Sequence, residues 1–293
     1  MIRRATILLC LIALVCGLVP YLGASEKGYA APALFGRLHH SYQPEDGKIF
    51  IMVIGTDARD GIYAGALGDA IHIVGVNTDK MRAGILNFPR DSYVNIPGRG
   101  TSKINEAILG GPETMARTLE SLTGIQLDYW VVTGFDGFMA MIEDLGAVRM
   151  RIPQDVYDPG GSGVNLKKGT HNLAPLTALA YVRTRKAFGS GDFARTQHQG
   201  DFMKALLGKL RRQVYVDPSM LLRWISTARE HSDLDLSAEE VFQLGILATQ
   251  IKPKDVGNVT VPGSTGSSGG ASVVYIGGGA SSIYQRFRAN GYL

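Results

Sequence analysis

Residues 48–55 read KIFIMVIG, a short apolar run rich in isoleucine that sets the fold class of the chain. Two similar runs follow at residues 70–76, AIHIVGV, and 83–88, AGILNF. Short continuous apolar runs between glycine, aspartate and asparagine are typical of strands buried on both faces of a sheet. Residues 77–82 are short and polar, which predicts a hairpin-like connection between the second and third strands.

Helical periodicity dominates the chain after residue 110. Strands that come first and then alternate with helices indicate an α/β fold, here an α/β/α sandwich with a central mixed sheet. The glycine- and serine-rich tract 263–270 is expected to be a flexible surface loop. The predicted helices are 112–122, 135–145, 175–182, 195–210, 218–228 and 237–246, and the later strands are 129–132, 256–261 and 272–276.

The first 25 residues predict a membrane anchor that forms one N-terminal transmembrane helix. Arg3 and Arg4 precede an uncharged run at residues 5–24, about the length that a hydrocarbon core of about 30 Å requires. Basic residues before the run and Glu26 after it place the amino end in the cytoplasm and the bulk of the protein outside. A cleaved signal peptide is the alternative, although the run exceeds the roughly 7 to 15 apolar residues usual there. We therefore expect a single-pass protein of the cell membrane with its domain on the extracytoplasmic side.

The rest of the chain divides into a linker and one domain. Residues 26–47 lack periodicity and predict a linker, 48–215 a catalytic domain, and 216–293 helices and late strands that complete it. Cys10 and Cys16 both lie in the anchor, so the exported part has no disulfide and depends on its apolar core. The formal net charge of +4 suits an anionic membrane or wall polymer, and no aromatic-basic pattern indicates nucleic acid.

Arginines gather in residues 179–199, LAYVRTRKAFGSGDFARTQHQ. Arg183 and Arg185 end one predicted helix, and Asp192 opens the next as a possible cap shortly before Arg195. A guanidinium is a planar fork that matches phosphate oxygens two at a time and keeps its charge at working pH. Three guanidinium groups where two predicted helices meet predict a binding site for a polyanion. The alternative is a solvated helix face.

Aspartates stand at two neighbouring strand ends. Asp57 and Arg59 follow the first strand in IGTDAR, and Asp69 directly precedes the second. Ligands gather where loops leave the strands of a sheet, and two carboxylates there suit a hard cation such as Mg²⁺ that also binds phosphates. The alternative is that these aspartates only stabilise turns.

A third group of polar residues lies in residues 88–105, FPRDSYVNIPGRGTSKIN. Arg90 and Asp91 end the third strand, and Lys103 and Asn105 open a predicted helix whose start adds N–H donors and a positive dipole end. Arg90 and Lys103 are therefore both candidates for binding a phosphate. The alternative is a loop of internal salt bridges.

These motifs, taken in order, resemble the LytR-CpsA-Psr domain of bacterial cell-envelope assembly proteins over about residues 48–210. The matching segments are IGTDAR, Asp69, NFPRDSYVNIPGRGTSKINEAILGGPE, LTGIQLDYWVVTGFDGF, EDLGAV, LAYVRTRK and DFARTQHQ. The resemblance implies a phosphotransferase that moves a glycopolymer from a polyprenyl pyrophosphate lipid onto peptidoglycan and forms a phosphodiester. It also implies Mg²⁺ as the cofactor and a membrane-anchored protein with its domain outside.

The resemblance assigns roles to individual residues. It implies that Asp57 and Asp69 bind Mg²⁺, that Gln199 lies in the site, and that Asp192 orients Arg195 or Arg185. Together with the patterns above, this gives a predicted catalytic set of Arg59, Arg90, Asp91, Arg183, Arg185, Asp192 and Arg195. If a base acts, we expect from the residues themselves that it is Asp69 or Asp91. The substrate-binding set is Arg59, Arg90, Lys103, Asn105, Arg183, Arg185, Arg195 and Gln199.

One departure from the family leaves the reaction open. Residues 65–70 read GALGDA and lack the arginine that usually precedes the second aspartate and the threonine that follows it. One phosphate contact is therefore missing or supplied from elsewhere. The alternatives are a non-catalytic binder of polyprenyl phosphates or wall polymer, and a pyrophosphatase that uses water. His72, inside the second strand, is expected to be a core residue rather than a base.

Overall fold

The computed structural model describes residues 33–37, 47–58, 65–185, 191–234 and 238–293. These residues belong to one compact unit, Ala31–Leu293. The anchor predicted for residues 1–25 lies outside the described residues and stays a prediction. In the described part of the chain, no helix combines the length and the apolar character needed to cross a bilayer.

A seven-stranded mixed sheet forms the centre of the unit, in the order β12-β1-β7-β2-β3-β4-β13. Strands β2, β3 and β4 are antiparallel neighbours, whereas β7 runs parallel to β2 and β13 parallel to β4. The mixed sheet predicted from the apolar runs is confirmed. The strand bounds are β1 (Ala33–Arg37), β2 (Lys48–Thr56), β3 (Gly68–Asn77), β4 (Arg82–Asn87), β7 (Tyr129–Thr133), β12 (Ser232–Leu234) and β13 (Val256–Thr260).

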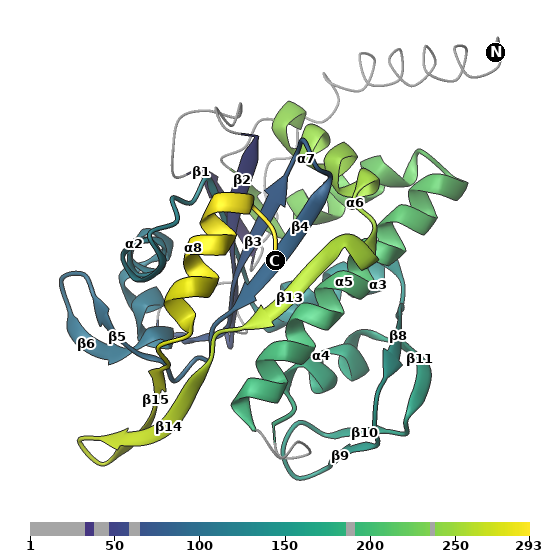
Figure 1. Ribbon diagram of the computed structural model, residues 1–293. Coiled ribbons are helices and arrows are strands. Elements are labelled where there is room, and N and C mark those ends of the chain that lie inside the picture. Colours follow the sequence, from purple (N-terminus) through teal and green to yellow (C-terminus); the bar gives the residue numbers. More distant parts are fainter. Residues whose placement is uncertain (1–32, 38–46, 59–64, 186–190, 235–237) are drawn as a thin grey trace. The chain divides into compact units, whose positions relative to one another are not determined.

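Helices cover both faces of this sheet (Figure 1). One face packs against η1, α2 and α8 through a core that includes Ile54, Ile73 and Phe287. The other packs against α5 and α7 through Ile49, Ile85 and their neighbours. The α/β layering follows from strands that are apolar on both faces. The helices are η1 (Ile104–Gly110), α2 (Pro112–Thr123), α3 (Phe135–Leu145), α4 (Pro175–Arg183), α5 (Asp192–Val216), α6 (Met220–Glu230), α7 (Ala238–Gln250), η2 (Pro253–Asp255) and α8 (Ala280–Asn290).

Two expectations about irregular segments were wrong. The tract predicted as a flexible loop contains β14 (Gly263–Ser268), which pairs with β15 (Ala271–Ile276) around a turn with positive φ at Gly269 and Gly270. Strand β1 lies inside the predicted linker and pairs with β7 and β12. Backbone pairing needs no apolar side chain, so neither strand leaves a pattern in the sequence.

Short two-stranded sheets complete the fold around the central sheet. In Figure 1 the β5/β6 hairpin lies near α2, and the β8/β11 and β9/β10 pairs lie near α4. Their bounds are β5 (Tyr93–Ile96), β6 (Gly100–Lys103), β8 (Val148–Ile152), β9 (Val156–Asp158), β10 (Val164–Leu166) and β11 (Gly169–Leu173).

A row of three glycines crosses the sheet where the C-terminal segment packs on it. Gly75, Gly84 and Gly257 are register partners on β3, β4 and β13. A Cβ at Gly84 would lie 2.7 Å from the Leu293 nitrogen and 2.9 Å from the Phe287 ring. The glycines therefore let the end of the chain approach the sheet backbone closely, and this contact ties the segment 216–293 to the domain.

We expect Gly84→Val to destabilise the protein by about 2 to 3 kcal/mol, because the added side chain meets backbone atoms that cannot move aside. Urea unfolding followed by circular dichroism measures the change. Gly278→Ala is the matched control, since nothing lies within 4 Å of its added Cβ. Equal stability of the two variants would contradict the close packing at the glycine row.

Candidate active site

Asp57 and Asp69 lie at the same edge of the sheet. The register pairs Thr56 at the end of β2 with Gly68 at the start of β3, next to an irregularity in the ladder. Asp57 Oδ1 accepts a hydrogen bond of 2.9 Å from the Leu67 N–H, which fixes the carboxylate at the turn. Asp57 is exposed and Asp69 is partly exposed, so both have carboxylate oxygens that solvent can reach.

Arg90 joins this edge to helix α5. Its Nη1 lies 2.5 Å from Asp69 Oδ1, and its backbone N–H donates to Asp192 Oδ2 at 3.3 Å. Burial lowers the pKa of Arg90, but the hydrogen bond to Asp69 and the charges of Asp69, Asp91 and Asp192 outweigh it and raise the pKa. The carboxylates therefore hold this guanidinium charged and in place.

Arg195 is the buried cation of the group. Its side chain is 3% exposed, and Nη2 lies 2.5 Å from Asp192 Oδ1. Burial, together with the charges of Arg90 and Arg185, lowers its pKa against the opposing effects of Asp192 and Asp69. Arginine still stays protonated. Two other guanidinium groups therefore lie close enough to repel Arg195, an arrangement that a bound polyanion would relieve.

Arg183 lies beside the segment that leaves β2. Its guanidinium sits over the Phe135 ring, 4.5 Å from the centroid. The Phe135 N–H donates to the Ala58 oxygen at 3.1 Å, directly after Asp57. Arg183, Arg185 and Arg195 therefore converge on the edge that carries the two aspartates. Arg59 lies outside the described residues.

Several buried polar atoms around this edge have no hydrogen-bond partner among the residues that the structure describes. They are Arg90 Nε, Asn105 Oδ1, Asp192 Oδ1, Arg195 Nε and Nη2, and Gln199 Oε1. Asn105 is held to Arg90 by a backbone hydrogen bond of 3.2 Å, and Gln199 Nε2 donates to the Val182 oxygen at 3.0 Å. Buried polar groups without partners are rare in folded proteins, so their concentration here indicates a bound polar ligand.

Lys103 and Asp91 form an ion pair of 2.9 Å next to this group. The nearby Glu106 accepts a hydrogen bond of 2.6 Å from Ser102 Oγ. Asp91 is thus held by a cation, and its carboxylate has 22% of its side-chain surface exposed.

Asp57 and Asp69 fit a magnesium ion on chemical grounds. Carboxylate oxygens are the ligands that Mg²⁺ prefers, and the ion usually completes its shell with water and substrate phosphates. A second group of carboxylates and histidine in the described residues comprises Asp144, Glu230 and His231, where His231 Nε2 lies 3.0 Å from Asp144 Oδ2. The pair at the sheet edge differs because it lies beside three arginines that suit a phosphate.

Comparison with known proteins identifies the family. Residues 26–286 match the model of the LytR_cpsA_psr family. The chain belongs to this family. The resemblance expected from the sequence motifs is thereby confirmed.

Relatives of this LytR-CpsA-Psr protein include curated proteins from two bacteria. Regulatory protein MsrR of Staphylococcus aureus (strain COL) is 33% identical over 220 residues, which cover 74% of this chain and 65% of the relative. Polyisoprenyl-teichoic acid–peptidoglycan teichoic acid transferase TagT of Bacillus subtilis (strain 168) is 35% identical over 178 residues, covering 57% and 54%. The matches therefore span less than two thirds of the length of these relatives.

Solved structures share the fold of this LytR-CpsA-Psr protein. The structure of TagT bound to LIIa-WTA gives a TM-score of 0.70 at 26% identity, covering 86% of this chain and 93% of that chain. The structure of YwtF (TagT) with bound octaprenyl pyrophosphate lipid gives 0.66 at 25% identity, covering 86% and 93%. The α/β fold predicted from the sequence is the fold of these relatives.

A buried polar network that sequence reasoning missed fixes α5 in this family member. Asn258 on β13 donates to the Gln197 oxygen at 3.0 Å and to Asp201 at 2.8 Å. Its own Oδ1 accepts a hydrogen bond of 2.7 Å from Asn87 on β4. The helix that carries Arg195 is therefore bonded to the sheet. Asparagine is depleted in strands, so Asn87 and Asn258 within apolar strands were the available signal.

His72 lies beneath this network as a buried neutral residue. Its Nδ1 is 2.8 Å from Asn87 Oδ1, and because the Asn87 amide donates elsewhere, Nδ1 is the donor. Burial lowers its pKa to about 4, the hydrogen bond with Asn87 partly offsets this, and the charge of Arg195 lowers it further. The structure supports its assignment to the core.

We expect this histidine to make stability depend on pH. Its folded pKa of about 4 lies below the ordinary histidine pKa of 6.5, so the unfolded chain binds more protons between these values and stability falls on acidification. The loss from this group is roughly 2 to 3 kcal/mol between about pH 7 and about pH 4.5. Urea unfolding of the parent and of His72→Gln at both pH values isolates it. A pH dependence that is the same in both chains would contradict a neutral buried His72.

Proposed function

We propose that this chain is a phosphotransferase that moves a glycopolymer from a polyprenyl pyrophosphate carrier onto peptidoglycan in a Mg²⁺-dependent reaction. The observation that carries the proposal is the convergence of Arg90, Arg185 and Arg195 on the sheet edge that bears Asp69. Family membership supports it, as do the relative TagT, a teichoic acid transferase, and the structure of TagT with an octaprenyl pyrophosphate lipid.

The arginines of the site account for binding the diphosphate. Arg195 and Arg90 supply N–H donors that have no partner within the described ranges, and Arg183 and Arg185 lie nearer the solvent. Such donors neutralise the charge that develops on the leaving phosphate, where preorganised groups stabilise a transition state most. When bound by Asp57 and Asp69, Mg²⁺ supplies further neutralisation of the phosphate oxygens.

The reaction balances without a covalent enzyme intermediate. A hydroxyl oxygen of the peptidoglycan acceptor forms a bond to the sugar-linked phosphorus, and the bond from that phosphorus to the bridging oxygen breaks. Polyprenyl monophosphate leaves, and the hydroxyl proton passes to the leaving phosphate or to a carboxylate. Asp69 and Asp91 are the candidate bases, and Asp91 needs to separate from Lys103 before it can act.

The proposal includes the location of the reaction. The basic residues and the uncharged run at the start of the sequence suit a single membrane anchor with the domain on the extracytoplasmic side. The lipid-linked donor and the peptidoglycan acceptor would then meet the domain at the extracytoplasmic face of the cell membrane.

A transfer assay tests the proposal. The full-length chain is incubated with a lipid-pyrophosphate-linked oligosaccharide, a peptidoglycan oligomer and Mg²⁺, with parallel samples that lack the acceptor or contain EDTA. We expect acceptor-linked oligosaccharide and polyprenyl monophosphate only when acceptor and Mg²⁺ are both present. Equal release of monophosphate without acceptor would favour the pyrophosphatase, and donor binding without any product would favour the binder.

A further inference from the structure

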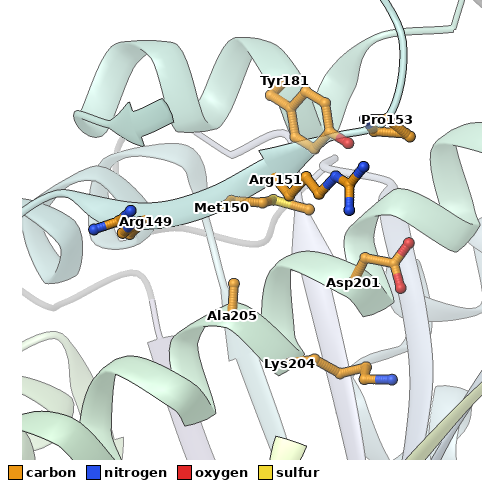
Figure 2. A pocket seen from close by; sticks show the side chains of 8 residues that line it. All are labelled: Arg149, Met150, Arg151, Pro153, Tyr181, Asp201, Lys204 and Ala205. Carbon is orange, nitrogen blue, oxygen red and sulfur yellow. The ribbon is translucent and has the colours of Figure 1, made fainter. Parts of the chain in front are cut away.

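A pocket lies between β8, α4 and α5. It has a volume of about 480 Å³, is open to solvent, and is lined by side chains that include Arg149, Arg151, Tyr181, Asp201 and Lys204. Figure 2 shows the Arg151 guanidinium, the Asp201 carboxylate and the Lys204 amine pointing to the same side, with Arg149 at the opposite end. None of these residues belongs to the site proposed above.

The charge of this pocket is positive. It has three cations and one carboxylate, and Asp201 already accepts a hydrogen bond of 2.8 Å from Asn258. In the described part of the chain, no ion pair involves Arg149, Arg151 or Lys204. Arginine forks without a protein partner suit phosphate oxygens, which they bind in bidentate geometry.

Tyr181 contributes a neutral donor to the same pocket. Its side chain is 1% exposed, and its hydroxyl has no hydrogen-bond partner among the described residues. Burial and the charge of Asp201 raise its pKa, so the hydroxyl stays protonated. Tyr181 lines the pocket together with Pro153 and Arg151 (Figure 2). A buried hydroxyl normally has a partner, so a ligand in the pocket explains its position.

The pocket and the diphosphate site are built on different faces of the same two helices. Tyr181 precedes Arg183 on α4, and its ring contacts that of His198 with 5.5 Å between centroids. Asp201 follows Arg195 by six positions on α5, about 9 Å along the helix axis, and Lys204 lies one turn further. Six positions also turn the helix by about 240°, so a polymer that begins at the diphosphate site would pass around α5 to reach this pocket.

We infer that the pocket binds a phosphate group in the polymer part of the donor, beyond its diphosphate. The inference rests on the proposed function, because it needs a donor whose polymer chain carries phosphates. Arg151 and Lys204 bind the phosphate oxygens, and the Tyr181 hydroxyl donates to the same anion. The pocket thereby selects an anionic polymer over a neutral one.

Binding of two soluble or detergent-dispersed probes tests the inference. Isothermal titration measures the dissociation constants of an oligo(glycerol phosphate) and of polyprenyl diphosphate without polymer, using the full-length chain and its Arg151→Ala/Lys204→Ala variant. We expect the variant to bind the oligomer about tenfold more weakly. Arg286→Ala/Lys252→Ala is the matched control, since both residues are exposed and the charge lost is the same. This control is expected to bind as the parent does.

Two further comparisons make the result decisive. Tyr181→Phe is expected to weaken oligomer binding about threefold to fivefold, as loss of one hydrogen bond does. Arg195→Gln is expected to weaken binding of polyprenyl diphosphate instead. If it does not, the proposed diphosphate site is wrong, whereas the result with the pocket variant tests the pocket alone. Equal oligomer affinity in the pocket variant and the control overturns the inference. A third probe, a soluble muropeptide, gives the other contrary result. If the pocket variant loses affinity for the muropeptide and not for the oligomer, the pocket binds carboxylates of the acceptor and the inference is overturned.

Discussion

Arg195→Gln is expected to lower the rate of glycopolymer transfer by about 100-fold to 1000-fold. The reason is that Arg195 is a buried cation near Asp69, Arg90 and Arg185, and its Nε–H has no partner among the described residues, so in the proposed reaction it would donate to the diphosphate from a buried position. Each hydrogen bond from a charged group to phosphate contributes about 1.5 to 3 kcal/mol, and a guanidinium can donate two such bonds to one phosphate. Initial rates of the transfer assay measure the loss.

Stability must be separated from catalysis in this variant, because Asp192 loses its partner at 2.5 Å. Arg195→Lys keeps the charge and removes the fork, and we expect it to retain the fold yet to lose about tenfold or more in rate. Arg286→Gln on α8 is the surface control. If Arg195→Lys transfers as fast as the parent while Arg195→Gln merely unfolds, Arg195 is structural only.

Asp69→Asn is expected to lower the rate of glycopolymer transfer by about 100-fold or more. The amide keeps the size of the side chain but removes the charge that holds Arg90 and that suits Mg²⁺. The Mg²⁺ concentration needed for half-maximal rate is expected to rise in the same variant. Titration of Mg²⁺ in the transfer assay measures both quantities.

The matched control is Asp79→Asn, which lies in the turn at the opposite end of β3 and is exposed. It removes the same charge far along the strand from the site. Parent-like Mg²⁺ dependence in Asp69→Asn would leave the magnesium assignment without support. A double variant with Arg90→Gln is expected to lose less than the sum of the single losses, because the two residues act as a pair.

The central strands and helices were predictable because each carries its own signal. The runs 48–55, 70–76 and 83–88 are apolar without interruption, and strands of this kind occur where helices cover both faces of a sheet. The helix expected at 135–145 has the observed bounds, and α5 starts three residues before its predicted start. β1 and β14 gave no such signal, because backbone hydrogen bonds alone recruit them to their sheets.

The candidate site was partly predictable for a different reason. Antiparallel strands return to the same edge, so Asp57 and Asp69 were expected to be neighbours once two strands were assigned. The partner of Arg90 could not be predicted, since Asp69 and Asp192 reach it from distant parts of the sequence. The same holds for the ring of Phe135 beneath Arg183, because only the tertiary fold brings α3 to the end of α4.

The most direct test is a crystal structure of the protein with a polyprenyl diphosphate and Mn²⁺ in place of Mg²⁺, recorded at a wavelength where manganese scatters anomalously. The account predicts an anomalous peak at the oxygens of Asp57 and Asp69, with the diphosphate within hydrogen-bonding distance of Arg195 and Arg90. A diphosphate bound elsewhere, with neither arginine in contact and no peak at the aspartates, would contradict it.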